Sequence, residues 1–240
     1  MKMIACLIFL VSLDSLALTD PTQGKPFFPW LWQDQMKPTI KEAGKGDNLK
    51  ILGAQLGATL ATRAYDSKVH AYQESHRNLL LGKQEAKDIG MATNGYVEIG
   101  IALIQLQFDQ SNGLAHARAL MLTSLSTSTL KIVIRRERPN HDNKLSYPSG
   151  HTSSTFATAT SLAYAYGAIA GVPAFAAAAM AGLSRIKDER HWASDVVGGA
   201  FMGYFWARSS FKAEAKEETE AVITPVPIDD GLVINLSKSF

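Results

Sequence analysis

The sequence has very little cysteine and almost no excess of charge. Its single cysteine, Cys6, lies inside an apolar run near the N-terminus, so a mature protein without that run contains no disulfide. The 24 Lys and Arg residues nearly balance the 22 Asp and Glu residues, which leaves a net charge of +2 over 240 residues. This balance excludes the strongly basic surface of a typical nucleic-acid-binding domain. We therefore expect no nucleic-acid partner.

The chain also lacks the overall hydrophobicity of a polytopic membrane protein. Hydrophobic residues make up 46% of it, and its mean hydropathy of −0.02 favours a soluble globular domain. Residues 152–184 contain no Asp, Glu, Lys or Arg, so a membrane-spanning segment is an alternative there. The stretch is rich in Ala, Ser, Thr and Gly, which gain little from lipid, and Gly171-Val172-Pro173 divides it. We interpret it as two tightly packed core helices, and Gly199 and Gly203 predict similar close packing in the last helix.

The N-terminus is typical of a secretory signal peptide. Lys2 precedes an uncharged apolar run over residues 3–13, and Ser15 and Ala17 are small residues at the positions read by signal peptidase. We predict a signal peptide over residues 1–17 and a periplasmic or secreted mature protein. An uncleaved membrane anchor is the alternative.

The remaining chain divides into three parts. Residues 18–47, rich in Pro, Gly and aromatic residues, predict an irregular segment on the domain surface. Its aromatic residues either pack on the outside of the core or face a membrane or substrate: Phe27, Phe28, Trp30 and Trp32. Residues 48–210 have helical periodicity and predict an all-α domain. Residues 211–240 predict a charged linker and a hairpin-like tail with its turn at Asp229-Asp230-Gly231.

The helices of the predicted domain follow from the spacing of apolar residues. Leu52, Leu56 and Leu60 recur every four residues and give the first helix one apolar face. A polar stretch over residues 66–83 follows. Further helices are predicted over residues 85–108, 113–135, 153–170, 174–185 and 189–208.

Three short segments within this domain concentrate residues that bind anions or transfer protons. They contain Lys131 with Arg138-Pro139, then Pro148-Ser149-Gly150-His151, then Ser184-Arg185 with His191 and Asp195. His191 and Asp195 are spaced i,i+4 on a predicted helix and therefore share a face. A carboxylate there accepts the Nδ1 proton of the histidine and leaves Nε2 free as a nucleophile or base.

The other residues of these segments suit a phosphate dianion. Ser149 and Gly150 precede a helix, whose first backbone N–H groups and dipole attract an anion. The guanidinium groups of Arg138 and Arg185 can each bind two phosphate oxygens, and Lys131 adds a point charge. A second histidine, His151, supplies a separate acid.

Each feature alone has a simpler structural explanation. The basic residues around Lys131 also suit a solvated helix end, Ser149-Gly150 suits a turn, and a lone His-x-x-x-Asp pair suits a structural hydrogen bond. Zinc is rejected because no other ligand pair has metal-binding spacing. The three segments together favour a phosphate-transfer site.

Together the segments resemble the signature of the type 2 phosphatidic acid phosphatase superfamily, which includes bacterial acid phosphatases, lipid phosphatases and vanadium haloperoxidases. The resemblance covers residues 131–195 and implies an all-helical bundle without a metal. It implies that His191 attacks phosphorus, that Asp195 orients His191, and that His151 protonates the leaving oxygen and then activates water. It implies that the phosphate oxygens are held by Lys131, Arg138, Ser149, Gly150 and Arg185.

The resemblance leaves several functions open. The leading hypothesis is a phosphatase for phosphate monoesters, either soluble or on a lipid head group, that needs no cofactor and is inhibited by vanadate. Peripheral contact with a membrane is compatible with it. A vanadium-dependent haloperoxidase, with vanadate as cofactor, is the alternative, and a phosphate-binding protein without catalysis is a third reading that would not need His191 with Asp195.

Overall fold

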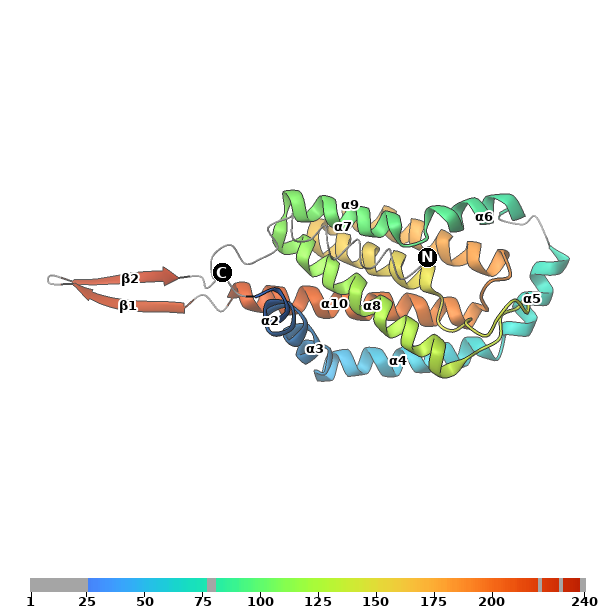
Figure 1. Ribbon diagram of the computed structural model, residues 1–240, viewed down its shortest axis with the longest axis horizontal. Helices are drawn as coiled ribbons and strands as arrows, with labels where there is room; N and C mark the ends of the chain where they lie inside the picture. Colours follow the sequence, from blue (N-terminus) through green and yellow to red (C-terminus); the bar gives the residue numbers. More distant parts are fainter. Residues whose placement is uncertain (1–25, 77–80, 220–221, 229–230, 238–240) are drawn as a thin grey trace. The chain divides into compact units, whose positions relative to one another are not determined.

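A computed structural model describes residues 26–76, 81–219, 222–228 and 231–237 (Figure 1). The predicted signal peptide, residues 1–17, lies outside the described residues. The chain divides into two compact units. The larger one comprises residues 42–214, and the smaller one combines residues 1–41 with residues 215–240.

The larger unit is helical, as the sequence predicts. Its elements are α4 (Gly46–Arg63), α5 (Asp66–Ser75), α6 (Lys83–Ala92), α7 (Tyr96–Phe108), α8 (Gln110–Ile134), α9 (Gly150–Lys187) and most of α10 (Ala193–Thr219). Within it α8 packs against α7 and α9, and α6 packs against α9 (Figure 1). The predicted helix over 85–108 is two helices, because Gly95 takes a left-handed conformation (φ 97°) between α6 and α7.

Helix α9 differs from its predicted form at both its start and its break. It begins at Gly150 rather than near residue 153, and its one non-helical residue is Gly167, with φ 69°. The predicted division of this stretch into two helices is confirmed, but the break lies at Gly167 rather than at Gly171-Val172-Pro173, and Pro173 lies inside a helix. Glycine, which has no Cβ, adopts positive φ without steric cost, whereas an isolated proline removes one backbone hydrogen bond.

The smaller unit is also more regular than the sequence predicts. The segment expected to be irregular forms α2 (Phe27–Trp30), the π-helix η1 (Leu31–Met36) and α3 (Lys37–Ala43), which continues into the larger unit. Pro29 falls in the first turn of α2, where its missing N–H costs no helical hydrogen bond. Helix α10 continues to Thr219, so part of the expected linker is helical.

The C-terminal hairpin is confirmed. Strand β1 (Val222–Ile228) pairs antiparallel with β2 (Gly231–Ser237), with Ile228 opposite Gly231. The turn residues Asp229 and Asp230 lie outside the described residues.

The interior of the larger unit is built from small and polar residues. Its buried hydrophobic cluster is Ala102, Leu120 and Ala157. The close packing predicted for α10 is confirmed, because a Cβ on Gly199 would lie 2.6 Å from the carbonyl oxygen of Ser149, and one on Gly203 would meet α9 still more closely. Small residues let these helices approach each other.

A buried polar network joins α7, α8 and α9. The ring of His116 is fully buried. Its Nδ1 atom lies 2.5 Å from Oε1 of Gln105, and its Nε2 atom lies 2.9 Å from Oγ1 of Thr158. The amide of Gln105 also donates to the hydroxyl of Tyr166, at 3.2 Å. A satisfied network of this kind fixes the relative positions of the helices that contribute to it.

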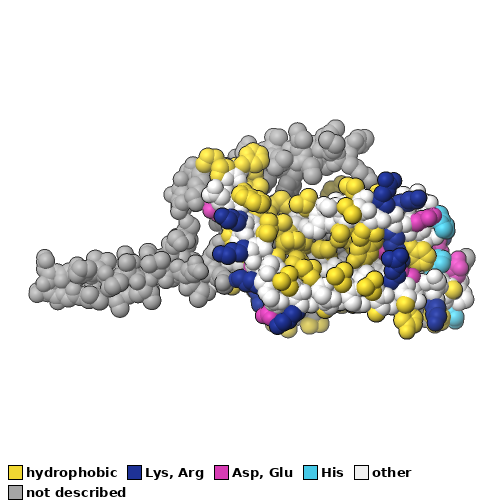
Figure 2. Space-filling model, turned by 90° about the horizontal axis from the view of Figure 1, so that it is seen from below, with side chains coloured by type: hydrophobic (Ala, Val, Ile, Leu, Met, Phe, Trp, Pro, Cys, Tyr) yellow, Lys and Arg dark blue, Asp and Glu magenta, His cyan; other side chains and the backbone are white. Residues whose placement is uncertain are grey.

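Large hydrophobic side chains lie mainly on the outside. Phe108 on α7 is 85% exposed and Ile169 on α9 is 92% exposed, and the predicted apolar face of α4 is exposed at Leu56 and Leu60. In the most apolar 18-residue stretch of α9, 28% of the residues are buried inside the protein. The interpretation of residues 152–184 as core helices therefore holds for residues 152–161, most of which are buried, and is wrong for residues 162–180, most of which are not. Figure 2 shows hydrophobic side chains over much of one face, with charged side chains at both ends of it and histidine side chains at one end.

Candidate active site

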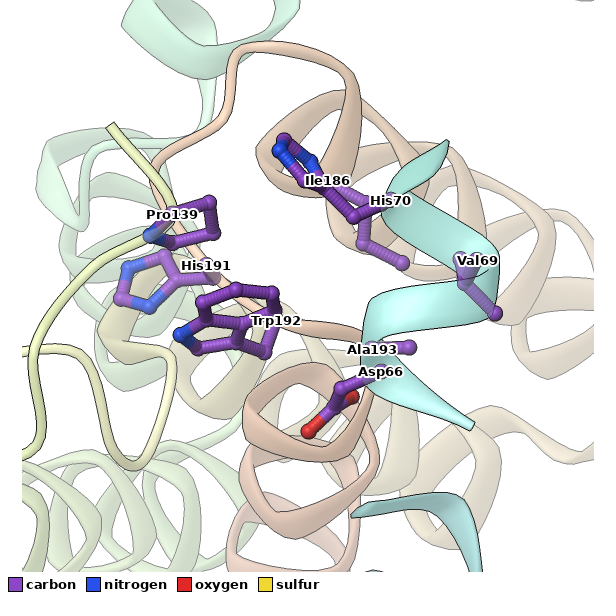
Figure 3. A pocket seen from close by; sticks show the side chains of 8 residues that line it. All are labelled: Asp66, Val69, His70, Pro139, Ile186, His191, Trp192 and Ala193. Carbon is purple, nitrogen blue, oxygen red and sulfur yellow. The ribbon is translucent and has the colours of Figure 1, made fainter. Parts of the chain in front are cut away.

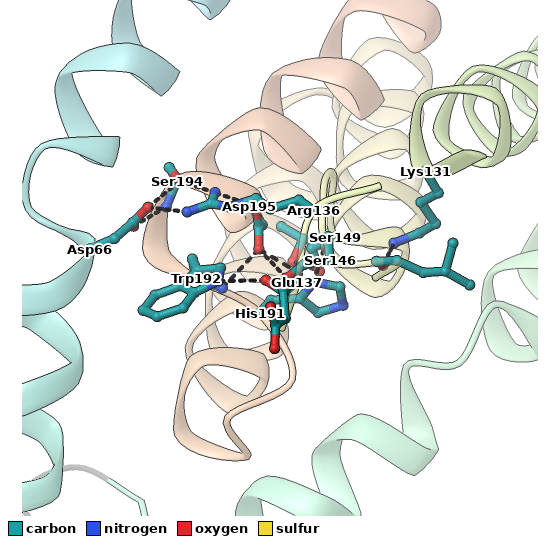
Figure 4. A network of polar contacts seen from close by, with 12 residues as sticks. Asp66, Lys131, Arg136, Glu137, Ser146, Ser149, His191, Trp192, Ser194 and Asp195 are labelled. Carbon is teal, nitrogen blue, oxygen red and sulfur yellow. Dashed lines mark hydrogen bonds and ion pairs between the residues drawn. The ribbon is translucent and has the colours of Figure 1, made fainter. Parts of the chain in front are cut away.

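The three sequence segments meet at one end of the larger unit (Figure 4). The loop of residues 135–149 follows α8 and leads into α9, and the loop of residues 188–192 joins α9 to α10. Lys131 comes from the last turn of α8, and Asp195 comes from the first turn of α10. Segments separated by more than sixty residues in the sequence thus contribute to one site.

His191 is held by the main chain. It lies in the loop before α10, which begins at Ala193 rather than near residue 189. Its Nδ1 atom lies 2.6 Å from the carbonyl oxygen of Ser146 and 3.9 Å from Oδ2 of Asp195. The expectation that Asp195 accepts the Nδ1 proton is therefore wrong, because His191 is not on the helix that carries Asp195. A carbonyl can only accept, so Nδ1 carries the proton and Nε2 is left with its lone pair.

Asp195 forms hydrogen bonds with both the loop of residues 135–149 and the loop of residues 188–192. Its Oδ2 atom accepts hydrogen bonds from the hydroxyl of Ser146, at 2.5 Å, and from the backbone N–H of Trp192, at 2.9 Å. Its Oδ1 atom accepts from the guanidinium of Arg136 at 2.6 Å. Burial would raise the pKa of Asp195, but contact with His191, these hydrogen bonds and the charge of Arg136 outweigh it and hold that pKa below its ordinary value. Asp195 is therefore an anion that fixes Ser146 and, through it, His191.

The imidazole of His191 is neutral over most of the pH range. Its side chain is 3% exposed, and burial lowers its pKa to about 4, against the opposing effect of Asp195. Lys131 and Arg138 lower that pKa further by repulsion. A buried neutral imidazole with Nε2 unprotonated has the form that a nucleophile requires.

The residues of the predicted phosphate cradle lie together at the start of α9. Ser149 is the N-cap residue of α9, and its backbone N–H donates to the carbonyl oxygen of Asp195 at 2.9 Å. Its hydroxyl accepts from Oγ1 of Thr152, at 2.9 Å. A Cβ on Gly150 would lie 3.9 Å from Cε of Lys131, so the lysine stem lies beside the helix N-terminus. This is the arrangement of a helix N-terminal anion site.

His151 lies in the first turn of α9, among the predicted cationic residues. Four groups act on it electrostatically: Arg185, His191, Lys131 and Arg138. The structure thus brings both predicted histidines and all three predicted cations together. Such proximity makes proton transfer and anion binding possible in one place.

Two of the cations retain buried donors. Nε of Arg138 and Nε of Arg185 are buried and have no hydrogen-bond partner among the described residues. The NH2 atom of Arg185 donates to the carbonyl oxygen of Ala86 on α6, at 3.2 Å, and lies 3.3 Å from Asp188. Lys131 donates to the carbonyl oxygen of Leu145, at 2.7 Å. Buried donors without a partner are costly unless an acceptor meets them, and phosphate oxygens are suitable acceptors.

Sequence analysis missed the residues that surround Asp195. Arg136 lies two residues before Arg138 in a basic run that also suits a solvated helix end, and Ser146 lies in a loop that has no pattern of its own. Asp66 and Ser194 complete the cluster with Arg136. Asp66 lies on α5, 70 residues before Arg136, and no local signal links the two.

A small pocket lies behind the histidine (Figure 3). It is lined by Asp66, Val69, His70, Pro139, Ile186, His191, Trp192 and Ala193. The rings of His70 and Trp192 meet edge to face, with centroids 5.6 Å apart. The lining includes His191 but none of the three predicted phosphate-binding cations.

Comparisons with known proteins point to one superfamily. The profile of the PAP2 superfamily matches residues 112–218. A 71-residue stretch is 45% identical to part of the lipid A 1-phosphatase of Porphyromonas gingivalis, covering 28% of this chain and 16% of that protein. The chain therefore spans about a sixth of the length of that relative. It is 32% identical over 152 residues to the decaprenylphosphoryl-5-phosphoribose phosphatase of Mycolicibacterium smegmatis, covering 58% of this chain and 83% of that protein.

Two solved structures share the fold. LpxE of Aquifex aeolicus superposes with a TM-score of 0.56 and 23% identity, over 61% of this chain and 94% of that one. A transmembrane PAP2 type phosphatidylglycerolphosphate phosphatase from Bacillus subtilis superposes with a TM-score of 0.58 and 18% identity, over 72% of this chain and 96% of that one.

Proposed function

The chain belongs to the PAP2 superfamily, and from this membership and the geometry of its site we propose that it is a metal-independent phosphatase for lipid phosphate monoesters, acting through a phosphohistidine. The observation that carries the proposal is the meeting of His191, His151 and three cations, two of which have buried guanidinium donors without a partner among the described residues. Pure phosphate binding would need the cations but not a histidine whose Nε2 is kept unprotonated.

The proposed reaction has two steps. Nε2 of His191 attacks phosphorus, the bond from phosphorus to the ester oxygen breaks, and His151 donates a proton to the departing oxygen. His151 then takes a proton from water, whose oxygen attacks phosphorus. The bond from phosphorus to Nε2 of His191 breaks, which restores the lone pair of Nε2 and releases inorganic phosphate. Ser146 and Asp195 hold His191 in place through both steps.

The charge that develops on the phosphoryl oxygens needs fixed positive groups. Arg138, Arg185 and Lys131 supply these charges, and the first backbone N–H groups of α9, with Ser149 and Gly150 at its start, supply further donors. Because these groups are positioned before the substrate binds, little reorganisation accompanies the transfer.

A lipid substrate fits the exterior of the protein. Lys83–Phe108 and Gly150–Lys187 are long and apolar enough to cross a membrane, and 22% and 28% of their most apolar windows are buried. In water this much exposed apolar surface would be unfavourable. In a bilayer the apolar side chains would face lipid, and helices that span a membrane commonly pack against one another through small and polar residues, as these do. We therefore place the helices in a membrane with the site near its surface. The two curated relatives are named as phosphatases of lipid A and of decaprenylphosphoryl-5-phosphoribose.

The proposal is tested by measuring phosphate release from detergent-purified protein. Phosphatidic acid, a polyprenyl phosphate and a polyprenyl diphosphate in mixed micelles are compared with soluble nucleotides and sugar phosphates. We expect hydrolysis of at least one lipid phosphate and none by His191→Ala. Preference for soluble esters would overturn the lipid assignment, and halide oxidation with added vanadate in place of hydrolysis would favour a haloperoxidase.

Location is tested separately. We propose an extracytoplasmic site, as the predicted signal peptide suggests, in a protein that stays with the membrane. Carbonate extraction should leave the protein in the membrane fraction, and an impermeant reagent should label Lys144→Cys from outside in a protein that also carries Cys6→Ser, because Lys144 is exposed. Release by carbonate would show peripheral attachment instead.

A further inference from the structure

A chain of charged side chains connects the site to α5, an element outside the three motif segments (Figure 4). The guanidinium of Arg136 bridges two carboxylates: NH1 lies 2.6 Å from Oδ1 of Asp195, and NH2 lies 2.6 Å from Oδ2 of Asp66. The side chains of Arg136, Asp66 and Asp195 are 16%, 6% and 0% exposed. Solvent therefore screens these ion pairs weakly.

Ser194 closes the cluster from the first turn of α10. Its hydroxyl donates to Oδ2 of Asp66 at 2.6 Å and accepts from NH1 of Arg136 at 2.6 Å. Its backbone N–H donates to Oδ1 of Asp66 at 2.9 Å. Asp66 thus satisfies a backbone donor at the N-terminus of α10, where the helix has no internal acceptor for it. Both oxygens of Asp66 are committed to the helix that carries Asp195.

This arrangement fixes the plane of the guanidinium. A guanidinium has its donors in a rigid fork, so holding one nitrogen on Asp66 determines where the other nitrogen points. That nitrogen meets Asp195, which in turn holds the hydroxyl of Ser146. The carbonyl of Ser146 then accepts the Nδ1 proton of His191. A displacement of Asp66 would therefore reach the nucleophile through a continuous series of hydrogen bonds.

We propose that Asp66 is a positioning residue for phosphoryl transfer: by orienting Arg136 and the start of α10, it holds Asp195 and Ser146 so that His191 points at phosphorus. This inference rests on the proposed phosphatase function. It predicts that Asp66 affects the rate of the chemical step rather than substrate binding, because within the described residues its hydrogen bonds run to Arg136 and Ser194 and not to a predicted phosphate ligand. A misplaced nucleophile lowers kcat and leaves KM nearly unchanged.

The test compares Asp66→Asn with Asp47→Asn in detergent-purified protein. Asp47 is a matched control, because it also lies in the first turn of a helix but its ion pair with Lys50 is exposed, at 3.1 Å. Asparagine keeps the shape of Asp66 but removes its charge and one acceptor oxygen. We expect kcat for the lipid phosphate to fall between about 10- and 100-fold in Asp66→Asn, with KM within about twofold. Asp47→Asn should match the wild type.

A double-mutant comparison separates positioning from general stabilisation. If Asp66 acts through Asp195, Asp66→Asn should have little further effect on kcat in an Asp195→Asn background. An equal loss in both backgrounds would show that Asp66 stabilises the fold without positioning Asp195, and would overturn the inference. An unchanged kcat in Asp66→Asn would also overturn it.

A second variant keeps the test decisive if Asp66→Asn does not fold. Arg136→Lys keeps the positive charge, but an ammonium cannot bridge two carboxylates in the same fixed geometry. We expect the same selective loss of kcat in this variant, measured well below its melting temperature. A folded Arg136→Lys enzyme with normal kcat would refute the inference. Lack of phosphatase activity in the wild type and in Asp47→Asn alike would instead refute the proposed function.

Discussion

The Nδ1 atom of His191 lies 2.6 Å from the carbonyl oxygen of Ser146, so its hydrogen bond runs to the main chain. Asp195, at 3.9 Å, acts on the ring indirectly, because it holds the hydroxyl of the same serine. The tautomer of His191 is therefore set by a backbone group that no substitution of a side chain removes. This separates the contribution of Ser146 from that of Asp195.

The first prediction follows from that separation. Ser146→Ala removes the hydroxyl through which Asp66 and Asp195 act on His191 but keeps the carbonyl that accepts from His191. We therefore expect kcat/KM to fall by about 10- to 100-fold, as for Asp66→Asn. Asp195→Ala removes the contacts to Ser146, Trp192 and Arg136 together, and we expect a loss of about 100-fold or more. Steady-state kinetics on one lipid phosphate would measure both. Equal losses would show that the serine hydroxyl carries the whole effect of Asp195.

The second prediction concerns pH. Burial lowers the pKa of His191 to about 4, from an ordinary value of 6.5, so the nucleophile stays neutral well below neutral pH. We expect kcat/KM to fall at acidic pH as His191 becomes protonated, with the midpoint of that fall near pH 4 rather than near pH 6.5. The folded state binds fewer protons here than the unfolded state, so stability from this site is full above pH 6.5 and is lost towards pH 4.

Melting temperatures of the wild type and of His191→Gln between pH 4 and 7 would check the predicted loss of stability towards pH 4. The wild type should lose more stability than the variant as the pH falls. Parallel curves would contradict the lowered pKa of His191.

The sequence predicted which residues meet at the candidate site, but it did not predict the residues that hold them in place. Short segments around Lys131, Ser149 and His191 have fixed spacings, and each spacing implies a local geometry. The contact between Asp66 and Arg136 depends on how α5 folds against the end of the bundle. No property of either local sequence specifies that packing.

The sequence also did not predict what surrounds the helices. Periodicity identified an apolar face on α4, yet Leu56 and Leu60 on that face are exposed. A repeat of apolar residues shows that one side differs from the other, but it does not show whether that side meets protein or lipid. In α9 the small residues, including Ala157, fill the interior, and larger ones such as Ile169 face outward.

The third prediction concerns the space that α6 leaves for Arg185. A Cβ on Gly90 would overlap the guanidinium of Arg185, which also donates to the carbonyl oxygen of Ala86. We expect Gly90→Ala to displace this guanidinium and to lower kcat/KM by about 100-fold, the cost of losing one preorganised transition-state donor. Gly100→Ala on α7 is the matched control, because no atom lies within 4 Å of its Cβ position. In an Arg185→Ala background Gly90→Ala should have little effect, whereas a full additional loss would point to general disruption of α6.

The fourth prediction concerns metals. Among the described residues, no cluster of three or more His, Cys, Asp or Glu side chains could hold a metal ion. Because the cations Lys131, Arg138 and Arg185 supply the positive charge, we expect hydrolysis of an aryl phosphate to survive exhaustive chelation and to be inhibited by vanadate. Loss of activity on chelation, with recovery on addition of zinc or magnesium, would contradict the proposed mechanism.

The last prediction separates the two histidines by leaving group. His191→Ala should abolish turnover of every substrate, because no phosphoenzyme can form. An alkyl phosphate, including a lipid phosphate, departs as a strongly basic alkoxide that needs a proton. His151→Ala should therefore slow its cleavage by about 10²- to 10⁴-fold, the usual contribution of a general acid. A dinitrophenolate is stable as an anion, so the His151→Ala enzyme should still expel it.

The same variant should then stop at the phosphohistidine, because His151 is also the base that activates water. Rapid-quench kinetics with dinitrophenyl phosphate should show a burst of phenolate of about one equivalent, and the protein should carry acid-labile phosphate. The wild type should show continuous turnover, and His191→Ala neither burst nor bound phosphate. A burst from His191→Ala and none from His151→Ala would mean that the two roles are reversed. A stalled phosphoenzyme in His151→Ala alone would establish both the covalent intermediate and the base that resolves it.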